Sequence, residues 1–345
     1  MEMQNINALR IDASTVCQLN CPCCPNPEGL FKDTCVGYGT LSIDNFKKIV
    51  MQLPGLDKIE LSNYGEVFLN KDLLKILAFA HAKGIAIDMS NGVNLNTATE
   101  EQLKAVVKYR VKHIVVSIDG TTQETYSRYR KKGNIGNVFK HIETINHYKK
   151  LYGSEEPKLT WQYIAFSHNI KQLPIAKSMA LGKNMDFFLK RNWDTSFDQL
   201  NDDDLAAETE LSLEWKTAIE KKRAPIDPEK YPFCLQLWLK QQINWNGEVL
   251  GCCVNFWQSY GNALKSDLTE ILKTTLYLKT KDMLIGKAFI TQSPCWRCDI
   301  FLSDIYPRYR TRYFMISPFN FLFKLFIEKR LRKIIFRLKS IARIK

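Results

Sequence analysis

The sequence predicts an α/β protein built on a parallel sheet, followed by a small cysteine-rich α+β region and a basic tail. Strand-like segments alternate with helical segments over residues 8–192. Short polar or glycine-containing motifs follow the ends of the strands, where parallel α/β proteins place their sites. The cysteines fall into two groups, because none lies between Cys35 and Cys234. The sequence therefore predicts two separate cysteine sites.

Each element is predicted from its hydrophobic period and its boundary residues. Strands are expected at 8–15, 58–66, 84–92, 113–120, 158–167 and 185–192. Helices are expected at 41–53, 72–84, 99–110, 136–151 and 173–184. Ser42 or Asp44 is suited to cap the first helix, Gly84 to end the second and Thr99 to begin the third. Right-handed crossovers between such units give an open sheet or a full or partial barrel.

The charge is concentrated at the C-terminal end of the chain. The net charge of the 345 residues is +13, and residues 306–345 carry twelve Lys or Arg and one acid, Glu328. The rest of the chain is nearly neutral, which argues against a nucleic-acid-binding face. We expect a barrel domain at 1–225, an auxiliary domain at 226–305 and the tail at 306–345. No export signal or membrane-spanning segment is recognised, so the ten cysteines are expected to be reduced.

The first cysteine site follows the first predicted strand. Cys17, Cys21 and Cys24 have the spacing Cys-x3-Cys-x2-Cys, and Cys23 lies between the last two. A closed [4Fe–4S] cluster normally takes four cysteines, so three leave one iron open to a reacting ligand. A structural zinc loop is the alternative.

This spacing resembles the radical SAM (S-adenosylmethionine) superfamily, and the resemblance extends over about residues 8–195. It implies a partial (β/α)6 barrel in which the open iron binds SAM and a 5′-deoxyadenosyl radical abstracts hydrogen from a substrate. The residues that the resemblance places around SAM are Gly65, Glu66, Asn91, Ser117, Asp119 and Arg130. Two positions depart from the family: Tyr64 replaces the first glycine of a Gly-Gly-Glu segment, and Cys23 replaces a residue that is usually aromatic.

Simpler roles stay open for three of these residues. Glu66 is alternatively an exposed acid at a strand end, Asn91 a turn residue and Arg130 a solvated helix charge.

The second cysteine site resembles the SPASM/twitch extension of radical SAM enzymes. Cys234, Gly247 and Cys252 are followed by a Gly-Asn pair and by Pro-Cys-x2-Cys. The resemblance implies one auxiliary [4Fe–4S] cluster, and so two clusters per chain, with Cys234, Cys252, Cys295 and Cys298 as ligands. Cys253 is the alternative to Cys252, and zinc is the alternative to a cluster.

The basic tail predicts an interfacial membrane helix. Within 317–345, apolar residues recur at steps of four and three opposite basic residues, after a run of phenylalanines. We therefore expect a cytoplasmic protein held peripherally on the inner face of the cell membrane. A helix packed on the protein itself or on a partner is the alternative.

The sequence as a whole predicts an enzyme that oxidises or epimerises a sugar or sugar-derived precursor of surface-polysaccharide type, either a small molecule or lipid-linked, with flavodoxin or ferredoxin as electron donor. Cys35 is the candidate hydrogen donor for epimerisation, and an inert buried thiol is its alternative role. A peptide-modifying maturase is the first rival, although no peptide-binding domain is expected ahead of residue 8. A non-enzymatic, metal-stabilised interaction protein at the membrane is the second.

Overall fold

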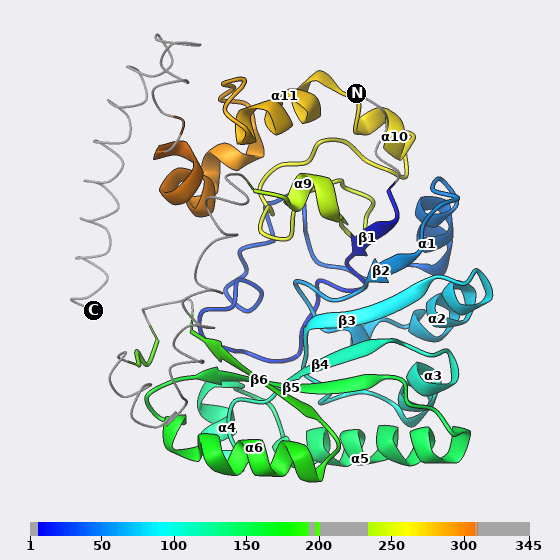
Figure 1. Cartoon of the computed structure of the whole chain (residues 1–345), viewed down its shortest axis with the longest axis vertical. Coiled ribbons are helices and arrows are strands. Elements are labelled where there is room, and N and C mark those ends of the chain that lie inside the picture. Colours follow the sequence, from blue (N-terminus) through cyan, green and yellow to red (C-terminus); the bar gives the residue numbers. More distant parts are fainter. Residues whose placement is uncertain (1–5, 193–196, 201–233, 308, 310–345) are drawn as a thin grey trace. The chain divides into compact units, whose positions relative to one another are not determined.

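The computed structural model describes residues 6–192, 197–200, 234–307 and 309 (Figure 1). Nearly all of the predicted tail, including 317–345, lies outside these residues, as does the acidic stretch 201–210. Within the described part, no helix is long and apolar enough to cross a membrane.

The core of the fold is a seven-stranded sheet in the order β6-β5-β4-β3-β2-β1-β7, with every neighbouring pair parallel. The strands are β1 (Ala8–Ile11), β2 (Lys58–Glu60), β3 (Ala86–Val93), β4 (His113–Ser117), β5 (Lys158–Ala165), β6 (Asp186–Arg191) and β7 (Gln241–Ile243). Because β6 and β7 are both edges, the sheet is a partial barrel and not a closed one. The predicted α/β parallel architecture is confirmed.

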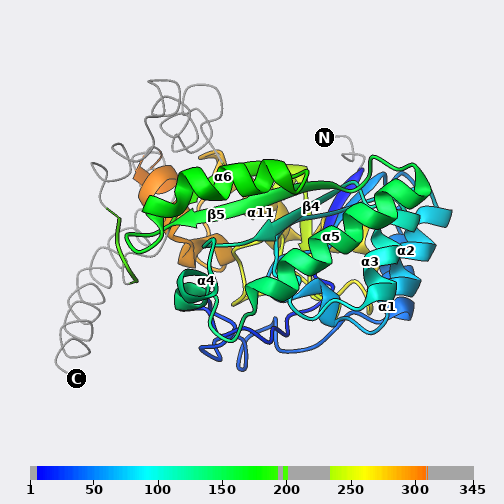
Figure 2. The ribbon, with the colours of Figure 1, turned by 90° about the horizontal axis from the view of Figure 1, so that it is seen from below.

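Helices connect successive strands and lie side by side along the sheet (Figure 2). They are α1 (Ile43–Val50), α2 (Leu73–Ala82), α3 (Glu100–Lys108), α4 (Gln123–Tyr129), α5 (Ile135–Tyr152) and α6 (Leu173–Gly182). Ser42 caps α1, and Thr99 forms a capping box with Gln102 at the start of α3. Gly84 follows α2 with a φ of +70°, which glycine adopts readily. The predicted helix boundaries are therefore confirmed at these ends.

The prediction omits several elements, among them α4 and β7. Helix α4 is a short helix that begins at the cap Thr122, and β7 has only three residues. An element of three residues is too short to show an alternating pattern, so β7 is recognised only through its pairing with β1. The strands are also shorter than expected. After Ile11 the chain bonds to several neighbours, as Asp12 N donates to Ile243 O and Thr15 N to Gly39 O.

The chain forms two compact units. The first unit takes residues 1–223 together with 236–271, which include α9 (Gln236–Leu239), β7 and α10 (Leu268–Ile271). The second takes 224–235 and 272–345. In the second unit, α11 (Thr275–Leu284) is followed by a 3-10 turn at Pro294–Arg297 and a π-helical turn at Phe301–Ile305. Trp296 packs there against Phe289, Phe301 and Tyr306.

Candidate functional site

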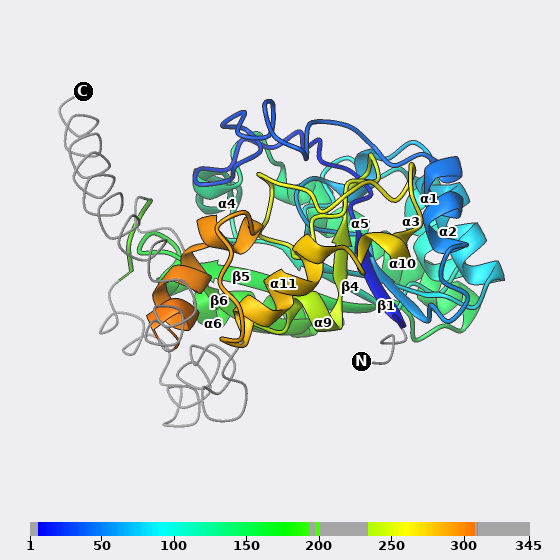
Figure 3. The same ribbon diagram turned by 90° about the horizontal axis from the view of Figure 1, so that it is seen from above.

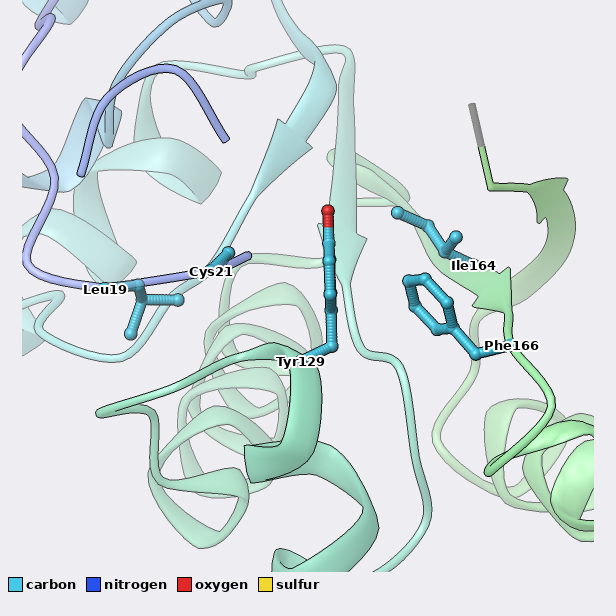
Figure 4. Packing of buried hydrophobic residues seen from close by; sticks show 5 residues of the cluster. All are labelled: Leu19, Cys21, Tyr129, Ile164 and Phe166. Atoms are coloured by element: carbon cyan, nitrogen blue, oxygen red, sulfur yellow. The ribbon is translucent and has the colours of Figure 1, made fainter. Parts of the chain in front are cut away.

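The loop after β1 brings three cysteines to one apolar cluster. Cys21 is 7% exposed and packs with Leu19, Tyr129, Ile164 and Phe166. Cys17 and Cys24 are half-buried against the same cluster. Figure 4 shows the Tyr129 ring between Cys21 on one side and Ile164 and Phe166 on the other. The cysteines thus lie in the loop that follows β1, and the side chains that cover them come from α4 and from the end of β5.

The loop lies beside α4, as seen from above in Figure 3. Asn20 N donates to Lys131 O just beyond that helix. Within the loop, Cys24 N donates to Cys21 O, and Cys23 has a φ of +62°. A cysteine in this left-handed region is unusual and reverses the chain between the last two predicted ligands. Cys23 is half-buried.

Two N–H groups face the sulfur atoms of the loop. Arg130 Nη1 lies 3.8 Å from Cys21 Sγ, and Asn94 Nδ2 lies 3.7 Å from Cys17 Sγ. Burial raises the pKa of Cys17 to about 12 and also raises the pKa values of Cys21 and Cys24. Such thiols stay protonated at neutral pH unless a metal takes the place of the proton.

The donor set of this loop fits an iron–sulfur cluster. Three thiols face apolar side chains and N–H donors, and N–H groups stabilise thiolate sulfur. Among the described residues, no three Cys, His, Asp or Glu side chains are grouped to hold a single metal ion. A cubane binds each cysteine through a different iron, so its ligands need not converge on one point.

Gly65 and Glu66 pack directly against the loop backbone. A Cβ on Gly65 would lie 2.4 Å from Ser14 O, so only glycine fits there. Glu66 is 1% exposed, and its carboxylate accepts hydrogen bonds from Phe68 N at 3.3 Å and Asn94 N at 2.7 Å. Burial raises its pKa to about 7. Glu66 is therefore not the exposed strand-end acid of the alternative interpretation.

Arg130 forms a buried ion pair. Its Nε lies 2.6 Å from Asp119 Oδ2, and the Asp119 side chain is fully buried. Asp119 Oδ1 accepts a second bond from Ile164 N, and the Arg130 guanidinium lies over the Tyr129 ring. The alternative of a solvated helix charge is wrong for Arg130. Ser117, at the end of β4, is 3% exposed and accepts a bond from Gln162 Nε2.

Asn91 lies at the exposed end of a hydrogen-bonded chain. Its Nδ2 donates to Asn63 Oδ1 at 2.7 Å, and Asn63 Nδ2 donates to Cys253 O at 3.2 Å. The end of β3 is thereby linked to the loop that carries Cys252 and Cys253. The structure gives Asn91 this positioning contact and leaves its side chain accessible.

Cys35 lies in a different apolar cluster from the three loop cysteines. It packs with Tyr64 and Phe256 against Phe31, Val36 and Leu250. Its Sγ donates to Phe256 O at 3.3 Å, and burial raises its pKa to about 11. Cys35 is therefore held as a protonated thiol.

The predicted auxiliary ligands are divided between the two compact units. Cys252 and its neighbour Cys253 belong to the first. Cys234, Cys295 and Cys298 belong to the second, where Cys298 N donates to Cys295 O across the turn at Pro294–Arg297. Their assignment as ligands stays a prediction of the sequence.

Asn94 was not predicted as a site residue, although it touches both Glu66 and Cys17. The aromatic group around the loop, Tyr129, Phe166 and Phe197, was not predicted either. The sequence signal for Asn94 is the polar pair Asn94 and Asn96 directly after a buried strand. It is weak, because asparagine also favours turns.

Comparisons with known proteins match both cysteine regions. Residues 11–154 match the radical SAM superfamily, and residues 234–299 match SPASM, an iron–sulfur cluster-binding domain. GTP 3′,8-cyclase of Clostridium botulinum (strain Hall) is 30% identical over 149 residues, which is 41% of this chain and 43% of that enzyme. The matched segment thus spans less than half the length of these curated relatives.

Solved structures share the fold over most of the chain. Streptococcus suis SuiB superposes with a TM-score of 0.61 at 16% identity and covers 86% of this chain and 72% of its own. SuiB bound to S-adenosylmethionine gives the same TM-score and identity, covering 71% of that chain. SuiB bound to its precursor peptide SuiA does likewise, covering 70%. At this identity the likeness shows a common fold.

Proposed function

Because this chain is a radical SAM superfamily enzyme with a C-terminal SPASM iron–sulfur region, we propose that Cys17, Cys21 and Cys24 hold its SAM-binding [4Fe–4S] cluster. SAM bound there supplies, on reductive cleavage, a 5′-deoxyadenosyl radical that removes a hydrogen atom from carbon. The observation that carries the assignment is that two predicted SAM-site residues are connected to the sulfur atoms, Arg130 directly and Glu66 through Asn94. The Glu66 carboxylate accepts a hydrogen bond from Asn94 N, and the Asn94 side-chain amide lies beside Cys17 Sγ. Asp119 forms an ion pair with Arg130, whose guanidinium lies beside Cys21 Sγ.

The polar residues at the strand ends have separate roles in this proposal. Gly65 lets the loop after β2 approach the cysteine loop, and Glu66 presents a buried carboxyl for the SAM amino group. Asn91, Ser117 and Asp119 line the same edge of the sheet. Arg130 supplies a positive charge for the SAM carboxylate, and its pairing with Asp119 orients the guanidinium. Tyr129, Phe166 and Phe197 offer aromatic faces that Cys23 does not.

For the auxiliary site, we propose Cys234, Cys252, Cys295 and Cys298 as ligands of one [4Fe–4S] cluster. The match of 234–299 to SPASM and the order of the cysteines support this assignment.

The substrate we propose is a sugar or sugar-derived precursor, which is oxidised or epimerised after hydrogen abstraction. In epimerisation, the Cys35 S–H bond breaks and a new C–H bond forms on the substrate radical. The Cys35 thiyl then takes an electron from a flavodoxin or ferredoxin and a proton from solvent. The hydrogen bond from Cys35 to Phe256 O supports this role, because a donor has to keep its proton. In oxidation, the substrate radical would instead give up a proton to solvent and an electron to the auxiliary cluster that the second group of cysteines would hold.

A peptide is the second candidate substrate. SuiB, whose structure was solved with its precursor peptide, shares this fold over 86% of the chain. One measurement distinguishes a sugar substrate from a peptide substrate. Candidate sugars and peptides carrying deuterium on carbon are incubated with SAM and reductant, and the true substrate transfers deuterium to 5′-deoxyadenosine.

The first experiment is anaerobic reconstitution with iron and sulfide. The proposal expects about eight irons per chain and reductive cleavage of SAM. Replacing Cys17, Cys21 and Cys24 together by Ala should remove about four irons and all SAM cleavage. Bound zinc without SAM cleavage in the wild type would instead support a non-enzymatic interaction protein.

Attachment to the membrane is a hypothesis from the sequence of 317–345 alone. Each basic residue near an anionic surface contributes about 1 kcal/mol. Deleting 317–345 should release the protein from phosphatidylserine-containing vesicles in a sedimentation assay. Equal binding by the deleted and full chains would contradict the hypothesis.

A further inference from the structure

Asn94 is a buried residue whose hydrogen bonds connect the cysteine loop to the end of β3. The residue is 5% exposed and follows the last residue of the strand. Its backbone N donates to Glu66 Oε2 at 2.7 Å, and its backbone O accepts from Asn96 Nδ2 at 3.0 Å. The main chain of Asn94 is therefore held on both sides.

The side-chain amide of Asn94 has only one orientation that satisfies its neighbours. Its Oδ1 accepts from Gln18 Nε2 at 2.7 Å and from Asn96 N at 2.9 Å. Both partners are N–H donors, so an amide turned by 180° would place its NH2 against them. The Nδ2 group consequently faces Cys17 Sγ, 3.7 Å away.

The setting of this contact distinguishes it from a surface hydrogen bond. Asn94 is almost fully buried, and Asn96 is itself held by Tyr126 OH. An N–H dipole that is fixed before a negative charge arrives stabilises that charge without reorganising. Reduction adds one electron to an iron–sulfur cluster and increases the negative charge on its sulfur ligands. Hydrogen bonds to those sulfurs therefore raise the reduction potential.

We propose that Asn94 is a positioning residue that orients Cys17 and raises the reduction potential of the SAM-binding cluster through its N–H···S bond. This inference rests on the ligands assigned above. The failures are distinguishable: a wild type without iron would overturn the ligand assignment, whereas an unchanged potential in the variants overturns only the role of Asn94.

The test is a redox titration of the reconstituted full chain followed by electron paramagnetic resonance. The first cluster is identified as the signal that changes on addition of SAM. In Asn94→Ala, the ratio of reduced to oxidised cluster at a fixed solution potential should fall about tenfold, which is about 59 mV for a one-electron couple. Iron content should stay at the wild-type value.

Matched controls separate the bond from charge and from loop polarity. Asn20 is exposed in the same loop. Asn20→Ala should leave the potential unchanged. Asn94→Asp keeps the acceptor oxygen for Gln18 and Asn96 but loses the N–H group, and Asn20→Asp adds the same charge nearby. Because the buried carboxylate of Asn94→Asp lowers the potential by its charge as well, the neutral and similarly sized Asn94→Leu is also measured, and it should show a fall that Asn20→Leu does not.

Three outcomes would overturn the proposal. The first is an unchanged potential in Asn94→Ala with full iron content. The second is equal shifts in the Asn94 and Asn20 variants. The third is loss of iron from both neutral variants, Asn94→Ala and Asn94→Leu, since the amide would then be needed for cluster assembly and not for the potential. If only Asn94→Ala takes up no iron, the comparison of Asn94→Leu with Asn20→Leu decides.

Discussion

The surroundings of Arg130 in the fold change the role that the sequence alone suggests for it. The sequence allows a solvated helix charge, but the guanidinium pairs with the fully buried Asp119 and contacts Cys21. A buried carboxylate that loses its partner retains the full cost of leaving water. Arg130 is therefore both a candidate SAM contact and a structural partner of Asp119.

Replacing Arg130 by Met should cost about 3–5 kcal/mol of unfolding free energy, because Asp119 is left buried with only the Ile164 N–H. Adding Asp119→Asn should recover part of that loss, since the buried charge is then removed. Urea unfolding of the reduced, metal-free protein measures both variants. Equal stabilities of the single and double variants would contradict the structural role of the pair.

Gly65→Ala should prevent normal packing of the cysteine loop. The new Cβ would meet Ser14 O, Thr15 C and Val16 O at 2.4–2.7 Å, and these are backbone atoms that no rotamer change can clear. We expect lower iron uptake in the first cluster and loss of SAM cleavage. Gly55→Ala is the control, because its Cβ would meet nothing within 4 Å. Similar iron content in the two variants would rule out the close approach at Gly65.

At the scale of elements, local signals were predictable and long-range pairing was not. The caps Ser42 and Thr99 are read directly from the sequence, because a cap depends on residues three positions apart. Strand β7 depends on pairing with β1 across more than two hundred residues, and three residues carry no period. The residues of the candidate site likewise fall into those that the sequence predicts and those that it does not. Motif residues such as Glu66 were predictable by resemblance, whereas the contact of Asn94 with Cys17 exists only after folding.

The β1–β7 junction predicts a pH dependence of stability. Asp12 is fully buried, its Oδ2 accepts from Gln242 Nε2 at 2.6 Å, and burial raises its pKa to about 8. The folded protein therefore keeps a proton on Asp12 at pH values where the unfolded chain, with a pKa of about 4, has lost it. The stability from this proton is complete below about pH 4 and is lost as the pH rises through about 8.

Asp12→Asn should remove this dependence, since the amide does not titrate in this range. Between pH 5 and 8, the wild type should lose up to about 1.4 kcal/mol of unfolding free energy per pH unit relative to the variant. Urea unfolding at several pH values measures the difference. Parallel stability curves for the two proteins would show that Asp12 is ionised in the fold.

At the scale of the whole molecule, the two cysteine regions were predictable from the sequence. Composition and spacing separate 17–35 from 234–298, and both regions match families that bind iron and sulfur. The compact units cut through the second region, because 236–271 folds with the barrel through β7. Cys252 and Cys253 are adjacent in residues 236–271. The spacing favours Cys252 as the ligand, and the local geometry of the loop decides which of the two thiols binds the cluster.

The backbone contacts of Cys253 lead to a prediction about this choice. Asn63 Nδ2 donates a hydrogen bond to the backbone oxygen of Cys253. This bond stabilises the loop and is kept whatever side chain stands at position 253. Cys253→Ala should therefore keep about eight irons per chain and normal SAM cleavage. Cys252→Ala should lose about four irons while still cleaving SAM, because the first cluster uses other cysteines. Iron analysis together with 5′-deoxyadenosine assays compares the two variants, and the reverse pattern would make Cys253 the ligand.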